Sequence, residues 1–180
     1  MLSNGLIIKV NSDTFTVKVD NKFIDTKARG KNRFEKIKPI VGDRVIVDTE
    51  KCVIESVLER RNSLSRPPVA NIDIALIVTS LKKPELSLSL LDRLISIVTI
   101  NNIEPVIVFT KIDLANRNDW KELKKLVKYY ENIGIKVFNN KRVRKLKKYL
   151  KNKIVTVCGH TVACKSTLIS KFNKTIFNVL

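Results

Sequence analysis

The chain has 180 residues, of which 44% are hydrophobic, 5 are glycine and 5 are proline, so it can bury a core and form one medium-sized or two small domains. Its longest uninterrupted apolar run, Ile74 to Val78, is far shorter than the roughly 20 residues that cross a bilayer, so we expect no membrane partner and a cytoplasmic location. The formal net charge of +18 favours association with a polyanion, and nucleic acid is the first candidate.

Residues 5–65 contain short segments in which apolar and polar residues alternate, such as Thr14 to Val19 and Arg44 to Val47. Alternation with a period of two is typical of β-strands. Several short strands within about 60 residues predict a small closed barrel, because closure removes the edges of such a sheet. We therefore expect an OB-like β-barrel over residues 1–66.

A basic loop lies between two of these expected strands. Its cations suit contact with the phosphate backbone of RNA better than stacking on bases. The residues assigned to this RNA contact are Arg29, Lys31 and Arg33. An ordinary solvated basic loop remains an equally good interpretation of this segment taken alone.

The pattern changes at Arg66-Pro67-Pro68, because consecutive prolines interrupt helices and sheets, and a second domain is expected over 67–180. It opens with a nearly continuous apolar run, 72–79, as expected for a strand buried on both faces of a parallel sheet. Strands and helices then alternate, which predicts an α/β domain with right-handed crossovers. Further strands are expected at 105–109, 135–138 and 154–157, and helices at about 88–98, 119–132, 142–150 and from 165 onwards.

Ligands bind such sheets at the carboxyl ends of the strands, and two segments in that position are distinctive. The first is Thr110-Lys111-Ile112-Asp113. The second has the layout of a phosphate loop, with a glycine at the strand end, a turn, and Lys165-Ser166 at the start of a helix, where Lys165 would meet phosphates and Ser166 would ligate Mg²⁺. The residues of this loop are Gly159, His160, Thr161, Val162, Ala163, Cys164, Lys165, Ser166 and Thr167.

The phosphate loop departs from the pattern G-x-x-x-x-G-K-[ST], because Cys164 stands where glycine is required. A residue with a Cβ at such a position costs roughly 1–3 kcal/mol and crowds the phosphates. Nucleotide affinity is therefore expected to fall by ~10- to 100-fold. A plain strand-turn-helix connection that binds nothing is the stronger interpretation of this loop taken alone.

The four residues 110–113 resemble the [NT]-K-x-D element of GTPases. That resemblance implies that the Asp113 carboxylate accepts two hydrogen bonds from guanine, which adenine cannot donate, and that the stem of Lys111 covers the base. Conventional GTPases place the phosphate loop before this element, whereas here the order is reversed. The reversal is the most informative feature of the pair.

Four further segments strengthen the resemblance, namely Arg29-Gly30-Lys31, Val41-Gly42-Asp43-Arg44-Val45, Arg60-Arg61-Asn62 and Arg66-Pro67-Pro68-Val69-Ala70-Asn71-Ile72-Asp73. With the reversed motif order and the preceding barrel, they resemble the RsgA/YjeQ family of circularly permuted GTPases of small-ribosomal-subunit assembly. The resemblance implies an OB-fold that contacts ribosomal RNA, a circularly permuted P-loop GTPase domain, and association with the small ribosomal subunit. It also implies GTP hydrolysis, with GTP or GDP and Mg²⁺ bound; no catalytic residue is assigned.

Three departures qualify what the resemblance implies. The family's phosphate loop has glycines where Val162 and Cys164 stand, and a Ser-Ala pair near guanine is replaced by Asn139-Asn140, so weaker nucleotide binding is expected. The chain ends at Leu180, before the family's switch region, D-x-P-G motif and C-terminal zinc domain. We therefore expect a truncated GTPase domain and no zinc in this chain.

The usual strand order of GTPases places the strand at 154–157 beside the strand at 72–79, with its outer edge unpaired in this chain. An apolar edge strand favours pairing with another chain, so self-association is expected.

Two functions remain open from the sequence. One is an RsgA-like GTPase of small-ribosomal-subunit biogenesis that binds GTP or GDP and ribosomal RNA. The other is a non-hydrolysing RNA-binding remnant whose barrel loops and basic segment 141–153 bind ribosomal RNA. Residues 117–153 carry 14 Lys and Arg against 3 Asp and Glu, a concentration of charge that general codon bias would not produce.

Overall fold

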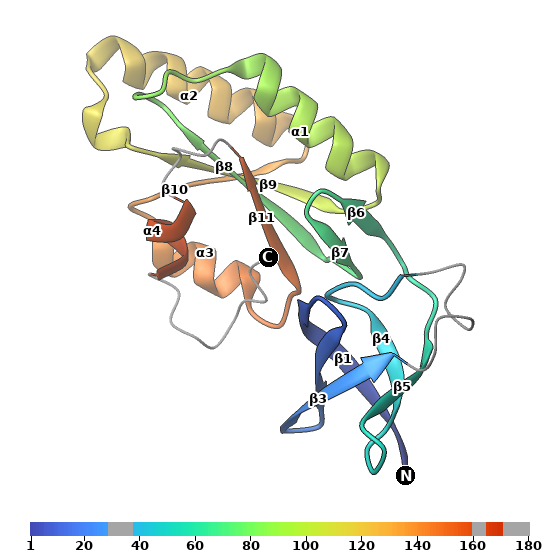
Figure 1. The fold of residues 1–180 in the computed structure, drawn as a ribbon. Helices are drawn as coiled ribbons and strands as arrows, with labels where there is room; N and C mark the ends of the chain where they lie inside the picture. Colours follow the sequence, from blue (N-terminus) through green and yellow to red (C-terminus); the bar gives the residue numbers. More distant parts are fainter. Residues whose placement is uncertain (29–37, 160–164, 171–180) are drawn as a thin grey trace. The chain divides into compact units, whose positions relative to one another are not determined.

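The structure, a computed structural model, describes residues 1–28, 38–159 and 165–170 (Figure 1). These residues form two compact units that divide between Ile72 and Asp73. The expected RNA contacts Arg29, Lys31 and Arg33 and the loop residues His160, Thr161, Val162, Ala163 and Cys164 lie outside the described ranges. No helix within those ranges has both the length and the apolar character that a membrane crossing requires.

The first unit contains the predicted closed barrel. Its strands are β1 (Leu2–Asn11), β2 (Thr14–Val19), β3 (Lys22–Ala28), β4 (Arg44–Asp48) and β5 (Val53–Val57), in the order β1-β2-β3-β5-β4, and antiparallel pairing of β1 with β4 closes the ring. The alternation seen in the sequence corresponds to side chains that point alternately into the barrel and outward. The inward set forms a buried core that includes Ile7, Val17, Val45, Val47 and Ile54.

A short hairpin, β6 (Ser63–Ser65) and β7 (Pro68–Ala70), follows the barrel and belongs to the same unit. Arg66 and Pro67 form its turn, so the paired prolines do not end the sheet structure here; Pro68 opens a strand, a position that needs no ladder donor. Asn62 fixes the hairpin, because its side chain exchanges two hydrogen bonds with the backbone of Ile72, at 2.7 and 2.8 Å.

The second unit is a parallel sheet with the strand order β10-β9-β8-β11. In chain order its elements are β8 (Ile74–Ser80), α1 (Leu88–Ile100), β9 (Glu104–Thr110), the 3-10 turn η1 (Ile112–Leu114), α2 (Arg117–Asn132), β10 (Lys136–Asn139), α3 (Val143–Leu150), β11 (Val155–Gly159) and α4 (Lys165–Ser170). Helices α1 and α2 cover one face of the sheet and α3 and α4 the other (Figure 1). The α/β prediction is confirmed.

Helix α2 begins two residues before the expected start at Asp119. Asn116 is its N-cap and accepts hydrogen bonds from the N–H groups of Asn118 and Asp119, while the Asp119 carboxylate bonds back to the Asn116 N–H. This reciprocal pair is a capping box, and it satisfies donors that would otherwise be unpaired at the helix start.

Strand β11 lies at the end of the sheet and, in the part of the chain that the structure describes, pairs only with β8. The expected position of this strand beside β8 is confirmed. Its inward residues Val155 and Val157 pack in a core cluster with Leu146 and Leu150 of α3 and Leu168 of α4.

Candidate nucleotide-binding site

The segment Thr110-Lys111-Ile112-Asp113 lies at the carboxyl end of β9, as predicted. Thr110 is buried, and its hydroxyl donates to the carbonyl oxygen of Thr79 on β8 at 3.2 Å. Lys111 then adopts the left-handed conformation with φ of 53°, and Ile112, the first residue of the following 3-10 turn, is buried. This sharp turn, anchored on both sides, presents Asp113 to solvent.

The Asp113 carboxylate is available to a ligand. Among the described residues it has no hydrogen-bond or ion-pair partner, and its side chain is exposed. A free carboxylate accepts hydrogen bonds through two oxygens, which is the arrangement needed to receive two adjacent N–H donors. The neighbouring Lys111 is already engaged, because its ammonium donates to the carbonyl oxygen of Lys83 in the loop after β8.

Asn139 and Asn140 lie immediately beside this segment, at the end of β10. The Asn140 N–H donates to the carbonyl oxygen of Phe109 at 3.0 Å, which places Asn140 next to Thr110. The Asn139 side chain accepts from the N–H of Lys141 at 3.1 Å. The side-chain oxygen of Asn140 is buried and has no partner among the described residues. The sequence placed Asn139-Asn140 near the expected guanine position, but it did not indicate this buried, unpartnered amide oxygen.

The second expected segment begins at Gly159, the last residue of β11. Gly159 has φ of 131°, and a Cβ there would lie 2.0 Å from the carbonyl oxygen of Val78, so glycine is required by close approach of the β8 backbone. Helix α4 begins at Lys165, as predicted, with Ser166 and Thr167 exposed. The Lys165 ammonium donates to the carbonyl oxygen of Gly159 at 2.9 Å.

Cys158 directly precedes this glycine. The pKa of its thiol depends on two effects, its burial and the nearby Lys165 ammonium. Burial raises the pKa of the Cys158 thiol to about 11, against a smaller opposing effect from the Lys165 ammonium. The thiol therefore stays protonated and uncharged near neutral pH. Cys158 acts as a packing residue at this site.

The two segments occupy the same edge of the sheet, on strands that flank β8. Thr110 is in register with Ser80 of β8, and Gly159 is in register with Val78 of the same strand. A free carboxylate thus lies at one end of this edge, and an ammonium with an exposed serine hydroxyl lies at the other. These groups match the donors and acceptors of a guanine base and of a phosphate–Mg²⁺ group, so the described residues fit a guanine nucleotide.

Two family models match the chain. The model described as RsgA GTPase matches residues 57–178, and the model described as RsgA N-terminal domain matches residues 4–52. The chain is 37% identical over 174 residues to the small ribosomal subunit biogenesis GTPase RsgA of Clostridium beijerinckii, and 38% identical over 178 residues to that of Limosilactobacillus reuteri. In each case the match covers 94% of this chain and 60% of the relative.

Two solved structures share the fold over nearly the whole chain. YjeQ from Thermotoga maritima matches with a TM-score of 0.86 and 32% identity, over 98% of this chain and 66% of that one. YloQ, described as a circularly permuted GTPase, matches with a TM-score of 0.82 and 31% identity, over 97% and 66%. The chain spans about 60% of the length of its curated relatives. The family models, the identity and the shared fold agree, and the chain belongs to the RsgA GTPase family.

Proposed function

We propose that this chain binds GTP and GDP with Mg²⁺ and serves as the barrel and GTPase unit of a cytoplasmic factor in small ribosomal subunit biogenesis. The observation that carries the proposal is the free, exposed Asp113 at the end of β9, on the same sheet edge as Gly159 and Lys165. Relatives that are 37% and 38% identical are named small ribosomal subunit biogenesis GTPases, which supports the ribosomal role.

The base-binding half of the site has separable roles. Asp113 accepts hydrogen bonds from the N1–H and the exocyclic amine of guanine. Thr110 holds the turn in place through Thr79, and the stem of Lys111 covers one face of the base. Because adenine lacks that pair of donors, the Asp113 carboxylate selects guanine over adenine.

The phosphate-binding half comes from the loop 159–167. Lys165 leaves its contact with the Gly159 carbonyl and binds phosphate oxygens, and Ser166 supplies a hydroxyl ligand for Mg²⁺. Mg²⁺ held there would neutralise phosphate charge. Since Lys165 must exchange one hydrogen bond for another, the net gain on phosphate binding is smaller than for an unengaged lysine.

A second function, an RNA-binding protein with a decayed nucleotide site, is favoured by a different observation. Residues 141–153 carry eight Lys and Arg and no Asp or Glu, and the glycine of the phosphate loop is replaced by Cys164. On this alternative, ribosomal RNA binds the basic segment and the barrel loop with Arg29, Lys31 and Arg33, and nucleotide does not bind.

Titration of a fluorescent GDP derivative in Mg²⁺ buffer distinguishes the two functions. We expect saturable binding in the ~1–100 μM range that excess ADP does not displace. Asp113→Ala should abolish binding, whereas Asp13→Ala, which removes an exposed aspartate of the barrel, should leave it unchanged. No binding by the wild type, or equal binding by both variants, would reject the guanine site.

We also propose that the open edge of β11 allows self-association. The strand is apolar and pairs only with β8 among the described residues, and an unpaired strand edge is a template for another strand. Sedimentation velocity across a tenfold range of protein concentration tests this. A single monomeric boundary at every concentration would reject it.

A further inference from the structure

A second cavity lies on the side of the sheet that α2 covers and adjoins the proposed nucleotide site at Phe109 and Asn139. It has a volume of about 280 Å³ and opens beside the β10 edge. Its lining includes the aliphatic residues Leu123, Val127 and Val137 and the aromatic residues Phe109, Trp120 and Phe138. None of the residues 110–113, Gly159, Lys165 or Ser166 lines it.

Three cations surround this cavity, Lys124 and Lys128 from α2 and Arg142 from the start of α3. All three are exposed, and within the described residues none has an ion-pair partner. Glu131 is the single acidic residue of the lining. The lining therefore combines aliphatic and aromatic residues with three cations and one acid, a net positive charge.

The cations at the rim contrast with other lysines on or near α2. The ammonium of Lys125 pairs with Glu122 at 2.9 Å, and that of Lys82 pairs with Asp119 at 3.2 Å. The carboxylates of Glu122 and Asp119 thus pair with these other lysines, and Glu131 is the one acidic residue of α2 that lines the cavity. Unpartnered cations beside an aromatic pocket fit an anionic ligand that has a flat apolar face.

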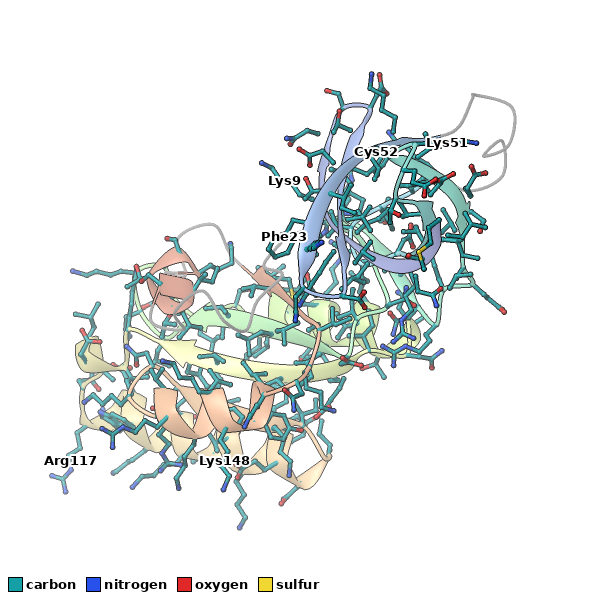
Figure 2. The ribbon with its side chains drawn as sticks, turned by 90° about the horizontal axis from the view of Figure 1, so that it is seen from below. Lys9, Phe23, Lys51, Cys52, Arg117 and Lys148 are labelled. Carbon is teal, nitrogen blue, oxygen red and sulfur yellow. The ribbon has the colours of Figure 1, made fainter. Side chains whose placement is uncertain are left out.

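The positive charge continues from the cavity along the chain. Arg142 belongs to the segment 141–153, with its eight cations and no acid. Figure 2 shows the side chain of Lys148, in this segment, and that of Arg117, at the start of α2, extending away from the ribbon into open space. A phosphate backbone that left the cavity at Arg142 would meet further cations along this segment.

We propose that the cavity binds one unstacked nucleotide of a single-stranded RNA, with its base against Trp120 and its flanking phosphates on Lys124, Lys128 and Arg142. A volume just below the roughly 300–1,000 Å³ of small-molecule sites suits one base and excludes a stack of several. An acidic peptide would use the cations but would leave the aromatic wall without a matching partner. The inference rests on the proposed function only in taking RNA as the polyanion.

Trp120 is the only tryptophan of the chain, so its fluorescence reports on this cavity directly. Titration of the full chain with hexa-adenylate should quench this fluorescence saturably, because a stacked base contacts the indole. Raising the salt concentration should weaken the binding, with a slope of about −0.7 in log K against log salt for each phosphate contact. Trp120→Leu, followed by the anisotropy of a labelled hexa-adenylate, should reduce affinity about tenfold.

Two double variants with equal loss of charge separate a specific site from general polyanion binding. Lys124→Gln with Arg142→Gln removes two cations of the rim, and should reduce affinity at least tenfold and lower the salt slope by about 1.4. Lys121→Gln with Lys125→Gln removes two cations of α2 that do not line the cavity, and should change affinity less than about threefold. Equal losses in the two doubles, or no quenching in the wild type, would overturn the proposal.

Two competitors and one variant complete the test. Quenching by poly-glutamate as strong as that by hexa-adenylate would overturn the proposal in favour of an acidic protein partner, and tighter binding of duplex RNA would overturn it in favour of backbone recognition alone. Asp113→Ala should abolish GDP binding and leave the RNA quenching unchanged. The guanine site and the RNA pocket can thus fail independently, because each has its own readout.

Discussion

Arg60 and Asp43 form a bidentate ion pair inside the first unit, with Nε donating to Oδ1 at 2.7 Å and Nη2 donating to Oδ2 at 2.8 Å. The side chain of Asp43 is fully buried, and its carboxylate also accepts from the N–H of Ile40 at 2.8 Å. Arg60 donates in addition to the carbonyl oxygen of Lys38 at 2.8 Å. The ion pair therefore joins the segment Val41 to Val45 to Arg60, and the charges of Asp43 and Arg60 compensate each other.

Arg60→Ala should destabilise the protein strongly, because it leaves the buried Asp43 carboxylate without its cation. We expect the free energy of unfolding to fall by about 3–5 kcal/mol, measured by urea denaturation followed by circular dichroism. Lys51→Ala is the control, since its ammonium lies 4.0 Å from Asp48 at an exposed position, where such pairs contribute about 0–1 kcal/mol. Equal small losses in the two variants would contradict the structural role of Arg60.

The element types of this fold followed from the sequence because its patterns are local. The alternation at Thr14 to Val19 corresponds to β2, and the helix expected at about 88–98 corresponds to α1. The hairpin across Arg66 and Pro67 could not be predicted from the sequence. It depends on Asn62 and Asn71, and the hydrogen-bond partners of these two side chains are distant backbone groups. Asn71 donates to the carbonyl oxygen of Gly42 at 2.9 Å, across 29 residues, and no local pattern contains such a contact.

Thr156→Val should stabilise the second unit. The Thr156 hydroxyl lies buried on the edge strand β11 and has no hydrogen-bond partner among the described residues. A buried, unsatisfied hydroxyl costs about 1–3 kcal/mol, so its replacement by a methyl group should raise the free energy of unfolding by about 1 kcal/mol or more. Urea denaturation measures the change.

Thr110→Val is the matched control for this substitution. The Thr110 hydroxyl is equally buried but donates to the carbonyl oxygen of Thr79, so its removal should lower the free energy of unfolding by about 0.5–1.5 kcal/mol. We therefore expect the two substitutions to change the free energy of unfolding in opposite directions. A loss of stability in Thr156→Val would mean that its hydroxyl is satisfied.

Alkylation of Cys158 should depend steeply on pH. The pKa of its thiol is raised by burial to about 11, so at pH 8 only about one molecule in a thousand carries the reactive thiolate. The rate of iodoacetamide modification should therefore rise about tenfold per pH unit between pH 8 and 10. Peptide mass spectrometry resolves this site from Cys52, which is exposed.

The same shift predicts a loss of stability in alkali. Since the pKa of Cys158 in the folded protein lies above its ordinary value of 9.0, the protonated thiol favours the fold. Its contribution is complete below about pH 9 and is lost as the pH rises toward 11. A Cys158→Ala variant should lack this component, and rapid modification of Cys158 at pH 8 would contradict the raised pKa.

The parts of the candidate site that lie at the ends of strands could be predicted from the sequence. Residues 110–113 and Gly159 could be placed because the carboxyl ends of parallel strands share one edge. The engagement of Lys165 with the Gly159 carbonyl and the buried amide oxygen of Asn140 could not be predicted, because both depend on three-dimensional proximity. The pocket at Trp120 was missed for the same reason, since α2, β10 and Arg142 all contribute to it.

Asp113→Asn should change the base specificity of the site from guanine to xanthine. The wild-type carboxylate is an acceptor at both oxygens, and guanine offers it two donors, N1–H and the exocyclic amine. Asparagine replaces one acceptor with an N–H₂ donor, which opposes the exocyclic amine of guanine but matches the carbonyl oxygen that xanthine has in its place. Since Asp113 has no partner among the described residues, the substitution should leave the fold unchanged. In competition against a fluorescent nucleotide, GDP affinity should fall at least tenfold and xanthosine diphosphate affinity should rise by a similar factor. A variant with lower affinity for GDP and no gain in affinity for xanthosine diphosphate would contradict contact between Asp113 and the base. Asp113 would then serve only to stabilise the turn after β9.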